Sequence, residues 1–262
     1  MDEPRVALVA GAATGPGRAV AMELRRAGWN VVAQVEPGGA AAVDEAADAE
    51  VSAGTDDQLV VFQGDLSSEP SRETFIEDAL ERFGRIDLLV GPAPSPSNHD
   101  AADLLELTLE GTLAAVSRGF LASMFLAQRA ANEMIRLIEG GSIDGGKIVF
   151  LGNISAYTTS GDQGLGCLNA AGTAMLTRLF ADRLGEFGIN VYEVRAGLMA
   201  TSRAEPGHAQ YDRLIREGLT PIRRWGRPAD IARAVAAIAA DELAFSTGQV
   251  INIDGGFHLR RL

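Results

Sequence analysis

Short continuous apolar runs alternate along the chain with stretches whose apolar residues recur every three or four positions. We expect the runs to be strands of a parallel sheet that is buried on both faces. They are Val6–Ala10, Val31–Val35, Leu59–Gln63, Ile86–Val90, Lys147–Leu151, Ile189–Val194 and Gln249–Ile253. The periodic stretches predict helices, as where Val20, Leu24 and Ala27 share one face. This alternation predicts an α/β fold, a single Rossmann-type doubly wound domain with about seven parallel strands flanked by helices.

Nothing along the chain marks a boundary between domains, so residues 1–262 are expected to form one domain. The stretch Pro37–Asp57 is rich in Ala, Gly and Asp and is interpreted as a helix with loose ends. Pro92–Pro96 predicts a rigid loop. The polar segment Ser202–Thr220 follows the sixth strand and is a candidate for a mobile lid.

The composition fits a globular protein with a large core and narrows the classes of partner. Hydrophobic residues make up 47% and charged residues 22% of the 262 residues, which argues against wholesale disorder. The formal net charge of −12 argues against nucleic acid and an anionic membrane surface as partners, although it also serves solubility. No apolar run reaches about 18 residues and no signal peptide precedes the first strand. A cytoplasmic protein without a membrane segment is therefore expected.

Metal and disulfide chemistry have little support in the sequence. Cys167 is the only cysteine, which excludes an intrachain disulfide and a Cys-rich zinc site. The histidines His99, His208 and His258 have no metal-ligand spacing and are expected at the surface or at the rim of a site. No metal is therefore expected, and Cys167, which has no basic neighbour in sequence, is expected to be a small packed residue.

A glycine-rich loop follows the first strand and precedes a helix. Gly11, Gly15 and Gly17 have the spacing G-x-x-x-G-x-G. Glycine allows a tight turn and a close approach of the backbone to a pyrophosphate, and the N-terminus of a helix supplies partly positive N–H groups. The loop can also be a turn that only packs the helix on the sheet. Pro16 has no N–H, so the loop has one fewer hydrogen-bond donor for a phosphate. The alternative is that Pro16 only favours the start of the helix.

Two carboxylates stand at the ends of the next two strands. Glu36 follows the second strand and is a candidate acceptor for the hydroxyls of a ribose. Asp65 and Leu66 follow the third strand. Either carboxylate can equally be an ordinary residue at the end of a strand. The candidate cofactor-binding residues are Gly11, Gly15, Gly17, Glu36, Asp65 and Leu66.

The order of these segments resembles the short-chain dehydrogenase/reductase family over nearly the whole chain. The glycine loop resembles its T-G-x-x-x-G-x-G, and Gly64–Leu66 resembles its adenine-binding D-V/L. The most specific part of the match is C-terminal. There, Arg224–Ala232 and Ser246–Gly256 resemble R-x-G-x-P-x-E/D-I/V-A and T-G-x-x-I/L-x-V-D-G-G. The resemblance implies a Rossmann fold, an NAD(P) cofactor, and dimers or tetramers.

The chemistry of that family needs a serine, a tyrosine, a lysine four residues after the tyrosine, and an upstream asparagine. The aligned positions hold Asn153, Gly166, Ala170 and Gly119. No tyrosine elsewhere has a lysine at i+4, because Lys147 is the only lysine of the chain. No catalytic residue is therefore assigned, and NAD(P) is expected to bind weakly or not at all.

These losses lead to the hypothesis of a catalytically degenerate member of the family. It would be the non-catalytic subunit of a hetero-oligomeric NAD(P)-dependent alcohol or hydroxyacyl dehydrogenase. Its partner would be an intact subunit of the family or a second copy, held through Ala171–Phe187 and Gly248–Leu262. Leu176, Phe180 and Leu184 form an apolar stripe on that helix, although one side of the helix must also pack on its own sheet. Two alternatives stay open, an enzyme with different chemistry on this fold and a nucleotide-binding sensor without catalysis.

Overall fold

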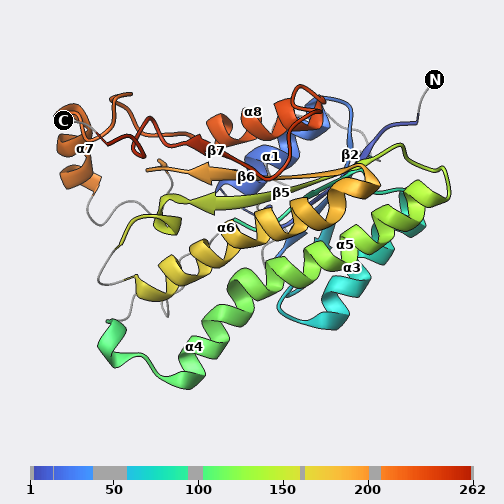
Figure 1. The fold of residues 1–262 in the computed structure, drawn as a ribbon, viewed down its shortest axis with the longest axis horizontal. Helices are drawn as coiled ribbons and strands as arrows, with labels where there is room; N and C mark the ends of the chain where they lie inside the picture. Colours follow the sequence, from blue (N-terminus) through green and yellow to red (C-terminus); the bar gives the residue numbers. More distant parts are fainter. Residues whose placement is uncertain are drawn as a thin grey trace.

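A parallel sheet of seven strands lies between two layers of helices (Figure 1). The computed structural model describes residues 3–13, 15–37, 58–93, 103–159, 163–200 and 208–260. The strands are ordered β3-β2-β1-β4-β5-β6-β7, and every neighbouring pair is parallel. They are β1 (Val6–Val9), β2 (Asn30–Val35), β3 (Leu59–Gln63), β4 (Leu88–Val90), β5 (Gly146–Asn153), β6 (Ile189–Ala196) and β7 (Gln249–Ile253). The predicted doubly wound fold is confirmed.

The adjacent strands β5 and β6 run past their apolar segments. They stay in register from Gly146 opposite Ile189 to Asn153 opposite Ala196. Backbone pairing does not depend on the polarity of the side chains, so the ladder continues into the polar Asn153 and Arg195. All strands are parallel and end on one edge of the sheet, called here the carboxyl edge, and begin on the opposite, amino edge. The extension of β5 and β6 therefore brings polar side chains to the carboxyl edge.

The helices divide between the two faces of the sheet. Helices α1 (Gly15–Arg26) and α8 (Pro228–Ala239) cover one face. Helices α3 (Glu69–Phe83), α5 (Ala122–Glu139) and α6 (Gly164–Leu184) cover the other (Figure 1). Each face has its own buried apolar cluster, because successive strand side chains point to opposite sides.

Shorter elements lie mainly at the ends of the strands and long helices. They are the 3-10 turns η1 (Leu104–Glu106), η3 (Ile154–Ala156) and η4 (Gly185–Phe187), the π-helix η2 (Ser117–Leu121), and the helices α4 (Leu109–Val116) and α7 (His208–Arg216). Figure 1 shows α4 and α7 at the end toward which the arrowheads of β5 and β6 point. These two helices therefore stand near the carboxyl edge.

The apolar stripe of helix α6 faces the sheet. Leu176 and Leu184 are buried, and the Phe180 ring lies 6.0 Å from the ring of Phe150 on β5. The stripe of Leu176, Phe180 and Leu184 is therefore the side of the helix that packs on its own sheet. The exposed apolar residues of the helix are Leu168, Met175 and Leu179. Assembly with another chain stays a prediction.

Several predicted segments lie wholly or partly outside the described residues. These are the helix over Pro37–Asp57 beyond residue 37, and the loop Pro92–Pro96 beyond residue 93. Of the segment Ser202–Thr220, the described part contains α7. Within the described ranges, no helix is long and apolar enough to span a membrane.

Candidate functional site

The glycine loop turns at the carboxyl edge between β1 and α1. Gly11 and Gly15 have φ of 68° and 59°, values that a residue with a side chain rarely adopts. A Cβ on Gly17 would overlap the carbonyl oxygen of Gly11, so the third glycine is needed for packing of the helix against the loop. Pro16 is the second residue of α1 and leaves the N–H groups of Gly17 and Arg18 free to donate at the helix start.

Gln34 holds this loop against the neighbouring strands. The sequence did not identify it as part of the site. Its Oε1 accepts a hydrogen bond from Gly11 N at 2.8 Å, and its Nε2 donates to Gly64 O at 2.7 Å. The side chain is buried, and Ala12 N donates to the Gln34 carbonyl oxygen at 2.7 Å. An isolated amide inside the apolar run Val31–Val35 is the signal that could have revealed it.

The structure brings the two predicted carboxylates together. Glu36 follows β2 and is exposed, and partial shielding from water and the charge of Asp65 raise its pKa. Asp65 accepts a hydrogen bond from Ser67 N at 2.8 Å. Leu66 is buried in the core beneath them. The glycine loop and the two carboxylates thus fit the pyrophosphate and the adenosine ribose of a dinucleotide.

Three residues at the positions of the family's catalytic groups lie at the end of β5 and at the start of α6. Asn153 ends β5, and its Oδ1 accepts a hydrogen bond from Ser155 N at 2.9 Å. Gly166 and Ala170 lie in the first turns of α6, where Ala170 is buried. No titratable group therefore stands at either of these two positions of α6. The amide NH₂ of Asn153 is the polar group that remains at the end of β5.

An amide from α6 fills the space left by Gly119. A Cβ on Gly119 would lie 2.5 Å from Cγ and Nδ2 of Asn169 and 2.6 Å from its Oδ1. Gly119 lies in the π-helical turn η2 with non-helical φ and ψ of −86° and −117°. Asn169 Nδ2 donates to Ala115 O at 3.2 Å, whereas its buried Oδ1 has no hydrogen-bond partner. The sequence contains this amide, but at a position that its alignment could not connect with Gly119.

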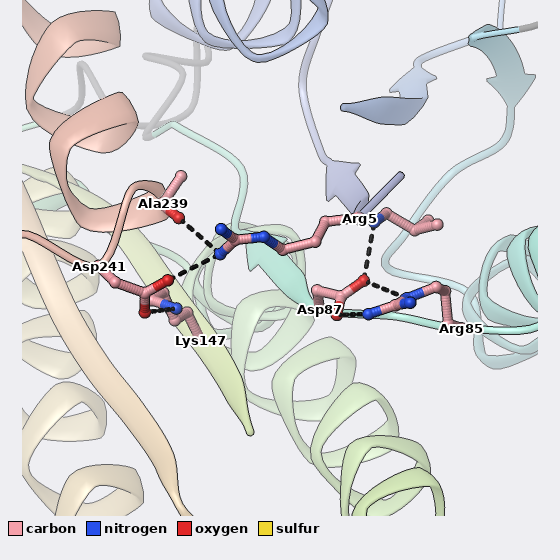
Figure 2. Close-up of polar contacts among 7 residues, drawn as sticks. Arg5, Arg85, Asp87, Lys147, Ala239 and Asp241 are labelled. Atoms are coloured by element: carbon pink, nitrogen blue, oxygen red, sulfur yellow. Dashed lines mark hydrogen bonds and ion pairs between the residues drawn. The ribbon is translucent and has the colours of Figure 1, made fainter. Parts of the chain in front are cut away.

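The only lysine of the chain lies at the amino edge of the sheet. Lys147 is the second residue of β5, and its ammonium lies 2.6 Å from the Asp241 carboxylate, which also pairs with Arg5 at 2.8 Å (Figure 2). Beside it, Asp87 accepts hydrogen bonds from Arg85 and from Val6 N (Figure 2). Six residues of strand separate Lys147 from Asn153, about 20 Å at the rise of a parallel strand. Lys147 therefore lies too far from the carboxyl edge to contribute to a site there.

A polar cluster joins the ends of β5, β6 and β7. The Tyr157 hydroxyl donates to Asp254 Oδ2 at 3.2 Å, and the Arg195 guanidinium lies 5.4 Å from the centre of the Tyr157 ring. Asp254 also contacts His258 Nδ1 at 2.9 Å. Arg195 is held by two hydrogen bonds to the buried Glu193 carboxylate, at 2.8 and 2.7 Å.

Burial and charge set the protonation of this cluster. Burial raises the pKa of Tyr157, the charge and hydrogen bond of Asp254 raise it further, and Arg195 opposes the shift. Partial burial alone would raise the pKa of Asp254, but hydrogen bonds from His258 and the backbone lower it below the usual range. The phenol therefore keeps its proton at neutral pH, and the carboxylate stays ionised beside it.

The remaining candidate groups are the thiol of Cys167 and the histidines His99 and His208. Cys167 is half-buried, and its Sγ lies 3.5 Å from the Thr158 carbonyl oxygen, which fits a packed thiol. His99 and the side chain of His208 lie outside the described residues. Across the described part of the chain, no three His, Cys, Asp or Glu side chains gather so as to hold a metal ion.

Known proteins match this chain along nearly its full length. A family model described as Enoyl-(Acyl carrier protein) reductase matches residues 11–258. L-rhamnose 1-dehydrogenase (NAD(P)(+)) of Sphingomonas sp. (strain SKA58) is 30% identical over 258 residues, 98% of this chain and 97% of that protein. The FabG 3-oxoacyl-(acyl-carrier-protein) reductase of Staphylococcus aureus (strain MW2) is 27% identical over 261 residues, 99% of this chain and 100% of that protein.

A solved structure matches equally well. The crystal structure of 3-oxoacyl-(acyl-carrier protein) reductase from Brucella melitensis in complex with NAD has a TM-score of 0.88 and 27% identity, over 100% of both chains. These relatives are named as a dehydrogenase and as reductases. The hypothesis of a non-catalytic subunit is therefore contradicted. The expectation that NAD(P) binds weakly or not at all is also unsupported, since NAD(P)(+) or NAD stands in the names of two of these relatives.

Proposed function

Because the chain belongs to the short-chain dehydrogenase/reductase family, we propose that it is an NAD(H)-dependent oxidoreductase that interconverts a hydroxyl and a carbonyl group. The observation that carries this proposal is the cradle of Gly11, Gly15 and Gly17 at the start of α1, with the carboxylates of Glu36 and Asp65 beside it. The bound dinucleotide supplies or accepts the hydride.

The charges at the end of β2 and β3 favour NAD(H) over NADP(H). Glu36 lies 19 positions beyond the last glycine of the loop, a spacing at which a carboxylate accepts hydrogen bonds from a ribose 2′-hydroxyl. The neighbouring Asp65 adds a second negative charge. A 2′-phosphate placed there would meet two carboxylates, so repulsion disfavours NADP(H).

Asn153 is the candidate group for polarising the substrate carbonyl. Its Oδ1 is engaged by Ser155 N, which fixes the plane of the amide and leaves Nδ2 as a donor. It stands at the end of β5, in register with Ala196 at the end of β6. A donor held in this way stabilises the negative charge that develops on a carbonyl oxygen during reduction.

Tyr157 is the candidate proton donor. Partial burial and Asp254 raise the pKa of this phenol, so it keeps its proton at neutral pH. It is a weaker acid than a free tyrosine, but it can still protonate an alkoxide, which is far more basic. Asp254 and His258 connect its hydroxyl toward solvent, from which the proton can be replaced. At neutral pH this group is therefore ready to give a proton, and the reduction of carbonyl compounds is the direction to test first.

Two measurements test this function. Titration calorimetry of the purified chain should detect NADH and a much weaker binding of NADPH, and Glu36→Arg should reverse that order. NADH oxidation should then be followed with 3-oxoacyl thioesters and with sugar lactones, and the reverse reaction with NAD⁺ and L-rhamnose. Tyr157→Phe should lower kcat by about 10²–10⁴-fold, the usual contribution of a positioned acid.

Tyr192→Phe is the matched control. It removes a phenolic hydroxyl that donates to Leu243 O at 2.8 Å, away from the carboxyl edge. It should cost about 1 kcal/mol of stability and leave kcat unchanged. Absence of binding for both dinucleotides would refute the proposed function. Unchanged kcat in Tyr157→Phe would remove Tyr157 from the mechanism while leaving the cofactor assignment in place.

A further inference from the structure

A pocket rich in arginine lies next to the carboxyl edge, between α7 and the segment that leads into α8. Its volume is about 410 Å³, and it is lined by Arg216, Arg223, Arg224 and Arg227 among other residues. Against these four guanidinium groups it contains a single carboxylate, that of Asp212. Such a concentration of positive charge is unusual on a chain with a net charge of −12.

The four arginines differ in whether a carboxylate holds them. Arg224 forms two hydrogen bonds with Asp230, at 2.7 and 3.1 Å, and is thereby fixed. No ion pair joins Arg216, Arg223 or Arg227 to an acidic residue in the part of the chain that the structure describes. Planar guanidinium groups bind carboxylates and phosphates through paired hydrogen bonds. The uncompensated charge therefore favours a ligand with an oxyanion.

The pocket also has a fixed apolar wall. Trp225 donates from its indole Nε1 to Asp212 at 2.6 Å, and the ring of Tyr211 packs edge-on against it at 6.2 Å. Ile215 lines the same pocket and is buried. Inorganic phosphate alone would leave most of such a volume empty, since pockets of this size hold small organic molecules. The ligand therefore combines an anionic group with an apolar or planar part.

The backbone connects this pocket directly to the carboxyl edge. Ala200, four positions past the end of β6, lines the pocket. Its N–H donates to Gly226 O at 2.8 Å, and Gly226 N donates to Leu198 O at 2.9 Å. The wall of the pocket is thus built on the segment that leaves β6, and Ala200 lies five positions after Arg195 along the chain.

We infer that this pocket binds a phosphate or carboxylate group at the non-reacting end of the substrate, an inference that rests on the proposed function. Oxyanion binding is tested first, on the full chain, by titration with phenyl phosphate. In a Trp29→Phe background, Trp225 is the only remaining tryptophan, and its fluorescence should report the binding. The double variant Arg216→Gln/Arg223→Gln should weaken the affinity by about ten- to a hundredfold, as expected for lost hydrogen bonds to a charged group.

Arg213→Gln is the matched control for that titration. Arg213 lies on the same helix, is exposed, pairs with Glu217 at 3.6 Å and does not line the pocket. It should leave the affinity unchanged. Equal affinities in the double variant and the control, or no binding of phenyl phosphate, would overturn the inference. NADH is titrated into the same samples. If phenyl phosphate does not bind but NADH does, the inference about the pocket fails and the proposed function stands.

A second experiment tests whether the pocket binds a group of the substrate or a free anion. Reduction of glyceraldehyde 3-phosphate by NADH should exceed that of glyceraldehyde in kcat/KM by at least about tenfold, and the double variant should abolish the difference. If phenyl phosphate binds but the two aldehydes react equally, the pocket holds a free anion and the assignment to the substrate is wrong.

Discussion

At the scale of single residues, Asn169 occupies the space into which a side chain at position 119 would project. The family's asparagine belongs at that position, so the chain has an amide in the same region but on a different helix. Sequence alone could identify the glycine and the asparagine separately. It could not pair them, because they are 50 positions apart in the sequence and only the packing of α6 on η2 brings them together.

Gly119→Ala is predicted to lower the free energy of unfolding by about 1–3 kcal/mol, the usual cost of overpacking. The added Cβ would lie 2.5 Å from the Asn169 amide. The second-site change Asn169→Gly should recover part of this loss, and a double-mutant cycle in urea should measure the coupling. Gly185→Ala is the control, since nothing lies within 4 Å of its Cβ position. Additive effects of the two changes would contradict the packing described here.

At the scale of elements, apolar runs and glycine spacing predict the sheet well, because buried parallel strands and a phosphate-binding turn are local patterns. All seven strands end within two residues of their predicted bounds. The sequence could not decide which side of α6 meets the sheet, because this helix has apolar residues on both sides. The pair of Tyr157 and Asp254 was also missed, since 97 positions separate the two residues.

The exposed face of α6 carries a prediction about assembly. Leu168, Met175 and Leu179 are each half-exposed or more, a pattern that favours contact with a second copy of the chain. Leu179→Arg should shift the protein toward monomer in analytical ultracentrifugation. Leu243→Arg, at an exposed leucine after α8, should not. A wild-type protein that sediments as a monomer at micromolar concentration would rule out this interface.

At the scale of the whole molecule, ion pairs link segments that are far apart in the sequence. Asp241 joins the start of β1, the start of β5 and the end of α8 through Arg5 and Lys147. Partial burial alone would raise the pKa of Asp241, but the hydrogen bonds from Lys147 and Arg5 lower it. Asp254, Asp230 and Glu133 also have lowered pKa values, whereas that of Glu36 is raised.

Stability is therefore predicted to fall in acid. A carboxyl group whose folded pKa lies below its unfolded value, about 4, contributes stability above that value, and the contribution is lost as the pH falls through the folded pKa. Urea unfolding at pH 7, 5, 4 and 3 should show this decline, and Asp241→Asn should flatten it. Asparagine tolerates the φ of 64° at this position. Asp182→Asn, at an exposed residue of α6, should leave the pH profile unchanged.

The placement of Lys147 gives the molecule a built-in chemical reporter. Its ε-amine is the only one among the side chains, and it is 12% exposed and held by Asp241. An acylating reagent reacts with a neutral, accessible amine, so labelling at this residue must wait for the amino edge to open. The rate of that labelling, read by mass spectrometry as a single added group, measures how often β1, β5 and the end of α8 separate in the native protein.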